Sequence, residues 1–337
     1  MSSGEKGNIN MKSGEFVINK GEYYIRNEAA ISEIIHNVRG GDYCTILGPP
    51  YCQKSFLLED VKNRLQATGD EVCVLLDLQK VDFATDDDFL AAFAATLWTI
   101  LRTKTKIKQP PSLDKVKDEQ SLKFFIQNCV ELFKRDLVLH IDHLERIRIG
   151  PLKSLLLVLR AIYNERDTDA PHWLGVVTAS SLSIAELSLG PTSPFNIARP
   201  TVVKDLNQTE CEKLIDCILG QRGTNIRPSA RIRLIQATGG DRYLIARLCN
   251  YCAELVSDKK NKQLTKREIE QAFTWFLNTE AEHHPPLLET IRVIEANPTA
   301  LMNVLKILDK KQVPRGELEL DLETVIDDLQ LTGSVRV

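Results

Sequence analysis

Gly48, Lys54 and Ser55 have the spacing of a loop that binds the phosphates of a nucleotide. In such a loop, backbone N–H groups and the start of the following helix hold the anionic phosphates. Lys54 would reach the β- and γ-phosphates, and the Ser55 hydroxyl would ligate Mg²⁺. We therefore predict that ATP or ADP binds here with magnesium. The residues expected to line this part of the site are Gly48, Cys52, Gln53, Lys54, Ser55 and Phe56.

Gln53 stands where the common form of this loop has a second glycine. A glycine lets the backbone approach the phosphates closely, whereas Gln53 adds a side chain that must swing aside. The alternative interpretation is a turn made by Gly48 and two prolines, followed by a chance lysine and serine. The flanking residues favour the phosphate loop, because a short apolar run at 43–47 precedes it and a helical pattern follows it.

An aspartate, Asp142, ends the apolar run at 137–142. In proteins with a phosphate loop, a carboxylate at this strand end holds Mg²⁺ through water. We therefore expect Ser55 and Asp142 to form the metal site; an aspartate that caps a helix after a core strand is the alternative. Hydrolysis needs a further acid to orient the attacking water, but His143 follows Asp142 directly. Glu145 is the candidate catalytic base, provided that the strand end curls toward the site.

Short apolar runs alternate with helical patterns over the first two hundred residues, which predicts a parallel sheet with helices on both faces. Together with the phosphate loop, this pattern gives an α/β fold of the P-loop NTPase class. The strands are expected at 43–47, 72–78, 137–142, 173–178 and 200–203.

After Asp205 the pattern becomes helical, and two capping boxes are expected, at Thr209 with Glu212 and at Thr265 with Glu268. From Pro285 onward the order helix, helix, strand, helix, strand is that of a winged-helix module, and its second wing strand would lie beyond Val337. We expect the chain to be a fragment of a longer protein. The expected organisation is a tail at 1–20, a P-loop NTPase domain at 21–204, a helical lid at 205–280 and a winged-helix-like domain at 281–337.

Six features occur in order along the chain: 24–27, 41–44, the phosphate loop, Asp142, 193–197 and 239–244. Together they resemble one family, the AAA-like NTPase domains of bacterial signalling proteins in the STAND group (signal-transduction ATPases with numerous domains). The resemblance implies an ATPase core, a lid and a winged helix, often followed by an effector domain. It implies a switch between an ADP-bound closed form and an ATP-bound open form. It also implies that Arg26 lies near the adenine and that Thr178 or Ser180 is a polar sensor.

The lid motif of such proteins is often Gly-x-Pro, but here it is Gly240-Asp241-Arg242. Arg242 could instead reach the γ-phosphate, as a sensor arginine does in related initiator-like ATPases. The missing proline, Gln53 and His143 are three departures from the family pattern. Together they suggest that hydrolysis is slow or absent, so that any ATPase activity would be weak.

The composition sets limits on the partners. The chain has 337 residues and a net charge of -3, so no global positive field attracts nucleic acid or anionic lipid. No apolar run approaches the roughly 20 residues needed to cross a bilayer, and no secretory signal is present, so we expect a cytoplasmic protein. The basic run between Lys259 and Arg267 is interpreted as a solvated loop; a nucleic-acid contact is the alternative, although the acidic segment at 317–328 would repel phosphates.

Three hypotheses follow from these patterns. The first is a nucleotide-gated signalling switch with effector or sensor domains beyond the C-terminus, which forms a homo-oligomer on activation. The second is a DNA-associated ATPase of the initiator or transposition type. The third is a scaffold for protein contacts that no longer binds nucleotide.

Overall fold

The computed structural model describes residues 16–19, 22–104, 115–166, 171–181, 197–281 and 288. The chain divides into two compact units. The first, called the sheet unit, comprises Asn27–Gly48 and Gln53–Val203. The second, called the helical unit, comprises Met1–Arg26, Pro49–Cys52 and Lys204–Val337. The tip of the phosphate loop therefore groups with the helical unit, although both of its flanks belong to the sheet unit.

The sheet unit is built on five parallel strands in the order β4-β5-β6-β3-β7. This arrangement confirms the predicted α/β fold with a parallel sheet. The apolar runs of β3, β4, β5 and β6 are strands buried on both faces, whereas β7 is a more exposed strand at the edge of the sheet. The observed bounds differ from the predicted ones by at most two residues. The strands are β3 (Tyr43–Leu47), β4 (Val72–Asp77), β5 (Leu137–Asp142), β6 (Leu174–Ser180) and β7 (Ala198–Val202).

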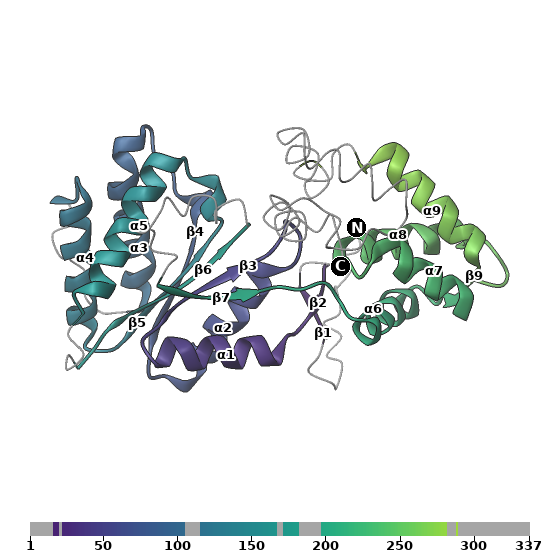
Figure 1. The fold of residues 1–337 in the computed structure, drawn as a ribbon, viewed down its shortest axis with the longest axis horizontal. Helices are drawn as coiled ribbons and strands as arrows, with labels where there is room; N and C mark the ends of the chain where they lie inside the picture. Colours follow the sequence, from purple (N-terminus) through teal and green to yellow (C-terminus); the bar gives the residue numbers. More distant parts are fainter. Residues whose placement is uncertain are drawn as a thin grey trace, which may run out of the picture. The chain divides into compact units, whose positions relative to one another are not determined.

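Helices cover both faces of the sheet (Figure 1). On one face, α1 (Glu28–Arg39) and α2 (Lys54–Thr68) bury a core around Ile34, Ile46 and Leu58. The helices of the other face are α3 (Phe89–Leu101), α4 (Glu119–Phe133) and α5 (Ile149–Asn164). They bury a larger core that includes three phenylalanines, Phe89, Phe93 and Phe125. Short 3-10 turns lie at Leu78–Lys80, Asp86–Asp88, Arg102–Lys104 and Leu144–Arg146.

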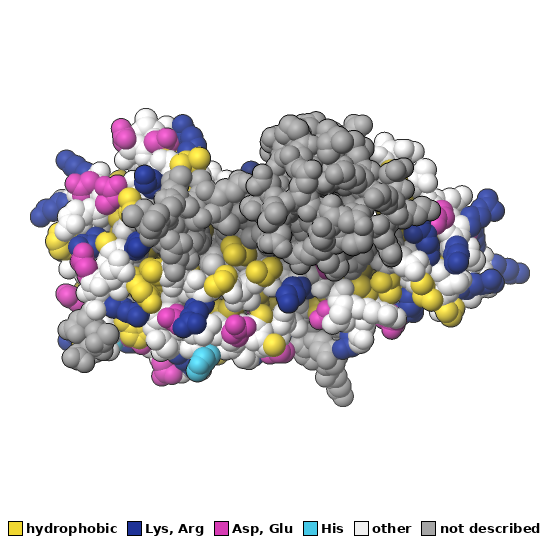
Figure 2. All heavy atoms as spheres, in the orientation of Figure 1, with side chains coloured by type: hydrophobic (Ala, Val, Ile, Leu, Met, Phe, Trp, Pro, Cys, Tyr) yellow, Lys and Arg dark blue, Asp and Glu magenta, His cyan; other side chains and the backbone are white. Residues whose placement is uncertain are grey.

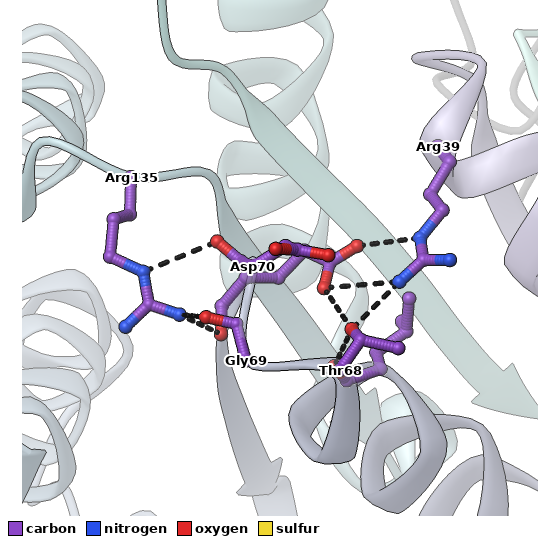
Figure 3. Close-up of polar contacts among 7 residues, drawn as sticks. Arg39, Thr68, Gly69, Asp70 and Arg135 are labelled. Atoms are coloured by element: carbon purple, nitrogen blue, oxygen red, sulfur yellow. Dashed lines mark hydrogen bonds and ion pairs between the residues drawn. The ribbon is translucent and has the colours of Figure 1, made fainter.

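Two arginines hold the turn that joins α2 to β4 (Figure 3). The Nε atom of Arg39 donates to the Glu71 carboxylate at 2.7 Å, and the hydroxyl of Thr68 donates to the same carboxylate at 3.1 Å. The Arg135 guanidinium donates to the carbonyl oxygens of Gly69, Asp70 and Glu71. Since Glu71 is only 5% exposed, Arg39 is the cation that compensates for burying its charge.

This network leads to a stability prediction. We expect Arg39→Ala to lower the free energy of unfolding by about 1–3 kcal/mol, because the buried Glu71 carboxylate loses its charged partner. The control is Arg64→Ala, which removes an ion pair to Glu28 in which both side chains are well exposed and which should contribute about 0.5 kcal/mol or less. Urea unfolding of the two variants measures the difference. Equal losses would contradict the role given to Glu71.

The helical unit contains four helices and two short strand pairs within the described residues. The antiparallel pair is β1 (Phe16–Asn19) with β2 (Glu22–Ile25), and the parallel pair is β8 (Asn225–Ile226) with β9 (Gln263–Leu264). The apolar stripes of the helices meet in a core that also takes in Ile25. The helices are α6 (Gln208–Gln221), α7 (Pro228–Thr238), α8 (Arg242–Leu255) and α9 (Lys266–Thr279).

One of the two predicted capping boxes is wrong. α6 is capped by Asn207, whose side chain accepts from the backbone N–H of Glu210, while Glu210 reaches back to the N–H of Asn207. The prediction placed this box at Thr209 and Glu212, two residues too late, because both pairs have the same spacing and Asn207 competes well as a cap. The box formed by Thr265 and Glu268 at the start of α9 is confirmed.

Some predictions fall outside the described residues. These are the segment 193–196, the winged-helix-like domain and the acidic stretch at 317–328. The domain boundaries given above also stay predictions. Among the described residues, no helix combines the length and the hydrophobicity that crossing a bilayer requires.

Candidate nucleotide-binding site

The phosphate loop connects β3 to α2, as the sequence predicts. Gln53, in the position of the missing glycine, has a φ of 73°, so the left-handed backbone that this position requires is kept without glycine. Tyr51 is also left-handed, with a φ of 65°. The Nζ of Lys54 donates to the carbonyl oxygen of Gly48 at 2.8 Å, which folds the lysine back over the loop. Cys52 is buried, and its N–H donates to the carbonyl oxygen of Pro49.

The start of α2 suits an anion. Gln53, the residue that precedes the helix, makes no capping hydrogen bond through its side chain, and the first turn carries no acidic residue. α1, α4, α6, α8 and α9 each begin with a side chain that caps the helix, whereas α3, α5 and α7 begin without one, as α2 does. A helix start carries partial positive charge and backbone N–H groups, which a phosphate can satisfy. The local structure therefore fits the predicted nucleotide.

Asp142 ends β5 and interacts with the next residue of the predicted site. The Ser55 side chain makes a hydrogen bond to the Asp142 carboxylate, and the backbone N–H of His143 donates to Asp142 Oδ1 at 2.9 Å. The residue is 7% exposed, and this burial raises the pKa of Asp142, although both hydrogen bonds oppose the shift. A divalent cation beside Ser55 and Asp142 would stabilise the buried carboxylate, so these two residues fit the predicted Mg²⁺ ligands.

One acidic residue of this edge, Asp77, is not among the site residues predicted from the sequence. It ends β4 and pairs in register with Asp142 on β5, so the two carboxylates leave the sheet at the same edge. Asp77 Oδ1 lies 3.1 Å from the Nδ1 of His143, and Lys80 forms an ion pair with its other oxygen. Burial alone would raise the pKa of Asp77, but the bonds to Lys80 and to the N–H of Gln79 lower it below its usual value. Asp77 therefore holds His143 in place beside Asp142.

Glu145, the candidate catalytic base, lies in the 3-10 turn after His143. His143 has a left-handed backbone, with a φ of 61°, which bends the chain after β5. The exposed Glu145 carboxylate accepts from the backbone N–H of Ser181 at 3.4 Å, at the end of β6. In this arrangement the Glu145 carboxylate interacts with the end of β6.

The two candidate sensors on β6 differ in their surroundings. The hydroxyl of Thr178 bonds to that of Thr45 at 2.9 Å, and both side chains are buried inside the sheet unit. Ser180 is the last residue of β6, and its hydroxyl donates to the carbonyl oxygen of Ser181. The position of Ser180 at the strand end makes it the better candidate.

Two predicted site residues belong to the helical unit. Arg26 follows β2 directly and is half-buried. Arg242 is the first residue of α8, and its Nη1 donates to the carbonyl oxygen of Lys204 at 2.7 Å. The turn before α8 needs glycine, because a Cβ on Gly240 would lie 2.4 Å from the carbonyl oxygen of Leu206. The contacts of Arg26 and Arg242 with nucleotide stay predictions.

The loop tip makes an aromatic contact within the helical unit. The ring of Tyr51 stacks on that of Tyr243 of α8, with ring centroids 4.7 Å apart and planes inclined by 16°. This pair could not be predicted from the sequence, because nothing in the spacing of residues 51 and 243 relates them. Tyr51 nevertheless stays 50% exposed.

This is the fold of a P-loop NTPase. It is defined by the sheet order, the phosphate loop between β3 and α2, and the aspartate at the end of β5. Comparison with protein-family models is more specific. Residues 12–302 match the AAA-like domain, and the chain belongs to this family. This confirms the predicted AAA-like class. No curated protein is similar enough to this chain to count as a relative.

Among solved structures, the ORC2 protein of Aeropyrum pernix, in ADPNP and ADP complexes, is similar over 94% of this chain and 82% of its own, with 16% identity and a TM-score of 0.50. The RuvB Holliday junction branch migration motor of Thermotoga maritima matches 74% of this chain and 70% of its own, with 13% identity and a TM-score of 0.46. At these identities, the likeness concerns the fold alone.

The backbone of Gln53 leads to a prediction. We expect Gln53→Gly to raise the affinity for magnesium ADP, because glycine lets the backbone approach the phosphates closely. It should also stabilise the fold, because glycine adopts the left-handed conformation without strain. The strain relieved is about 1–2 kcal/mol, and the extra chain entropy of glycine offsets about 0.5–1 kcal/mol of it. Thermal unfolding with and without magnesium ADP measures both effects.

The matched control is Gln53→Val, since a β-branched residue tolerates this backbone poorly. It should lower both the melting temperature and the shift caused by magnesium ADP. If the valine variant binds as tightly as the glycine variant, the conformation of residue 53 does not govern binding.

Proposed function

We propose that this chain binds ATP or ADP with Mg²⁺ and acts as a nucleotide-dependent switch of the STAND type, with slow or absent hydrolysis. The observation that carries the proposal is the meeting of Ser55 and the buried Asp142 at the uncapped start of α2. A helix start, a lysine and a site for a hard cation are together what a magnesium triphosphate requires. The family supports the same reading, because AAA-like domains are P-loop ATPases in fold.

The proposed roles follow the positions of the residues. Lys54 neutralises the β- and γ-phosphates, and Ser55 and Asp142 hold Mg²⁺, directly and through water. Ser180 senses the γ-phosphate from the end of β6, with Thr178, two residues before that end, as the alternative. Arg26 lies near the adenine and Arg242 contacts the γ-phosphate. A switch of this kind needs only different affinities for the two nucleotide states.

Slow hydrolysis is proposed because of the residues that follow Asp142, where an acid would orient the attacking water. The residue after Asp142 is His143, which interacts with Asp77, and Glu145 interacts with the end of β6. Neither side chain is a free carboxylate beside Asp142 that could orient water. Exchange of ADP for ATP would then change the state of the switch. Effector domains beyond the C-terminus and assembly into a homo-oligomer would respond to that change.

A DNA-associated ATPase is the second candidate. Exposed lysines and arginines in the segments 222–227 and 260–267 of the helical unit favour it. The two candidates differ in what the nucleotide controls, signalling partners or DNA. The scaffold hypothesis, by contrast, requires that no nucleotide binds at all.

The first test concerns nucleotide that stays bound during purification. We expect the purified chain to carry ADP or ATP, and Lys54→Ala to lose it, because the lysine supplies the main charge for the phosphates. Lys62→Ala, on the same helix but beyond its first turn, is the matched control and should keep the nucleotide. Chromatography of the acid-released nucleotide gives the occupancy. Full occupancy in the Lys54 variant would show that the site is placed wrongly.

The second test concerns turnover. We expect the ATPase rate of the wild-type chain to be no higher than that of Asp142→Ala, since neither His143 nor Glu145 offers a carboxylate beside Asp142 to orient the water. Steady-state phosphate release, with nucleotide binding measured in parallel, separates loss of catalysis from loss of binding. A wild-type rate at least tenfold above that of the variant, about 1.4 kcal/mol in barrier height, would contradict the binding-only switch.

A further inference from the structure

The parallel pair β8 and β9 brings two helix starts of the helical unit together. Asn225 pairs with Gln263 and Ile226 with Leu264, and the N–H of Arg227 donates to the carbonyl oxygen of Leu264 at 3.1 Å. Since each strand leads directly into a helix, α7 and α9 begin side by side. Residues that are distant in the sequence therefore share one surface.

This surface is strongly positive. The segments 222–233 and 254–270, both fully described, contain nine Lys and Arg against four Asp and Glu, whereas the whole chain has a net charge of -3. Three of the cations form ion pairs, namely Arg231, Arg233 and Lys259. The other six, called the basic surface, are all exposed: Arg222, Arg227, Lys260, Lys262, Lys266 and Arg267.

The basic surface is not neutralised by the described part of the chain. No ion pair joins any of its six residues to a described carboxylate. Arg222 and Arg227 donate only to neutral amides, to Asn250 Oδ1 at 3.3 Å and to Gln263 Oε1 at 3.2 Å. Dark-blue side chains gather at the end of this unit where β9 and α7 lie (Figures 1 and 2). The fold holds these six positive charges close together although they repel one another.

The neighbouring side chains narrow the choice of partner. The two segments contain no aromatic residue, so bases of a single strand have no ring on which to stack. Their one large exposed hydrophobic side chain is Ile232, which gives a lipid surface little to insert. What the surface offers is a row of guanidinium and ammonium groups beside two helix starts, which suits phosphate oxygens.

We propose that the basic surface binds the phosphate backbone of double-stranded DNA without reading its sequence. Phosphodiester groups supply regularly spaced single charges and require no apolar contact, which matches the residues present. The surface lies apart in the sequence from every residue of the phosphate loop, and this binding goes beyond the proposed nucleotide switch. Its strength falls steeply with salt, because each neutralised phosphate releases counterions.

The test measures fluorescence anisotropy of a labelled DNA duplex of mixed sequence with the full chain over a series of salt concentrations. We expect the triple variant Arg227→Glu, Lys262→Glu and Lys266→Glu to bind at least about tenfold more weakly at low salt, and the slope of log affinity against log salt to be shallower by up to about 3. The control, Lys115→Glu, Lys117→Glu and Lys153→Glu, makes the same charge change at exposed lysines of the sheet unit and should bind like the wild type. Circular dichroism melting verifies that both variants fold.

Four results would overturn the proposal. The first two are no salt-dependent binding by the wild type and an equal loss of duplex affinity in the two triple variants. The others are tighter binding of single strands than of the duplex, or competition by a polyglutamate peptide as effective as that by unlabelled duplex. The last result would identify an acidic protein as the partner. Lys54→Ala should bind the duplex as the wild type does. Failure of the nucleotide site and failure of the DNA surface are therefore distinguished.

Discussion

The site depends on one constraint: a carboxylate, Asp142, is buried at the end of a parallel strand beside the start of α2. A buried carboxylate costs free energy unless hydrogen bonds or a cation compensate it, and Ser55 together with the backbone of His143 supplies only part of that compensation. The parallel sheet places the carboxyl ends of β4, β5 and β6 at one edge, so the polar residues of three strands meet there. A Mg²⁺ ion bound there would complete the balance.

The same edge explains why hydrolysis is expected to be slow. Asp77 and Asp142 pair in register, and His143 lies between their carboxylates. An imidazole there interacts favourably with both acids, whereas a third carboxylate would be repelled by them. The arrangement stabilises the site, and under the proposed function His143 then stands where an acid would orient the attacking water. Binding and turnover are thus separable properties of this edge.

Much of the sheet unit could be predicted from the sequence, since strands buried on both faces are continuous apolar runs bounded by turn residues. The phosphate loop was predictable because the apolar run at 43–47 precedes it and a helical pattern follows it, as such a loop requires. Asp77 could not be found in this way, because its role depends on the register of β4 against β5, and a single sequence carries no register. Asp77 does end an apolar run, just as Asp142 does. This likeness is the one feature of the sequence that could have identified Asp77 as a site residue.

The helical unit was predicted less accurately. Asn207 and Thr209 offered equivalent caps for α6, and propensity alone did not choose between them. The stack of Tyr51 on Tyr243 and the alignment of α7 with α9 both result from contacts between distant residues. The basic run at 259–267 was visible in the sequence, but its continuation through Arg222 and Arg227 appears only once β8 pairs with β9.

The central claim is that magnesium nucleotide binds at the phosphate loop. Isothermal titration of the nucleotide-stripped chain with ADP, in the presence and absence of Mg²⁺, tests it most directly. The account predicts saturable heat at one site per chain and a clear loss of affinity without Mg²⁺, because Asp142 then keeps its uncompensated charge. Absence of saturable heat with Mg²⁺ present would contradict it.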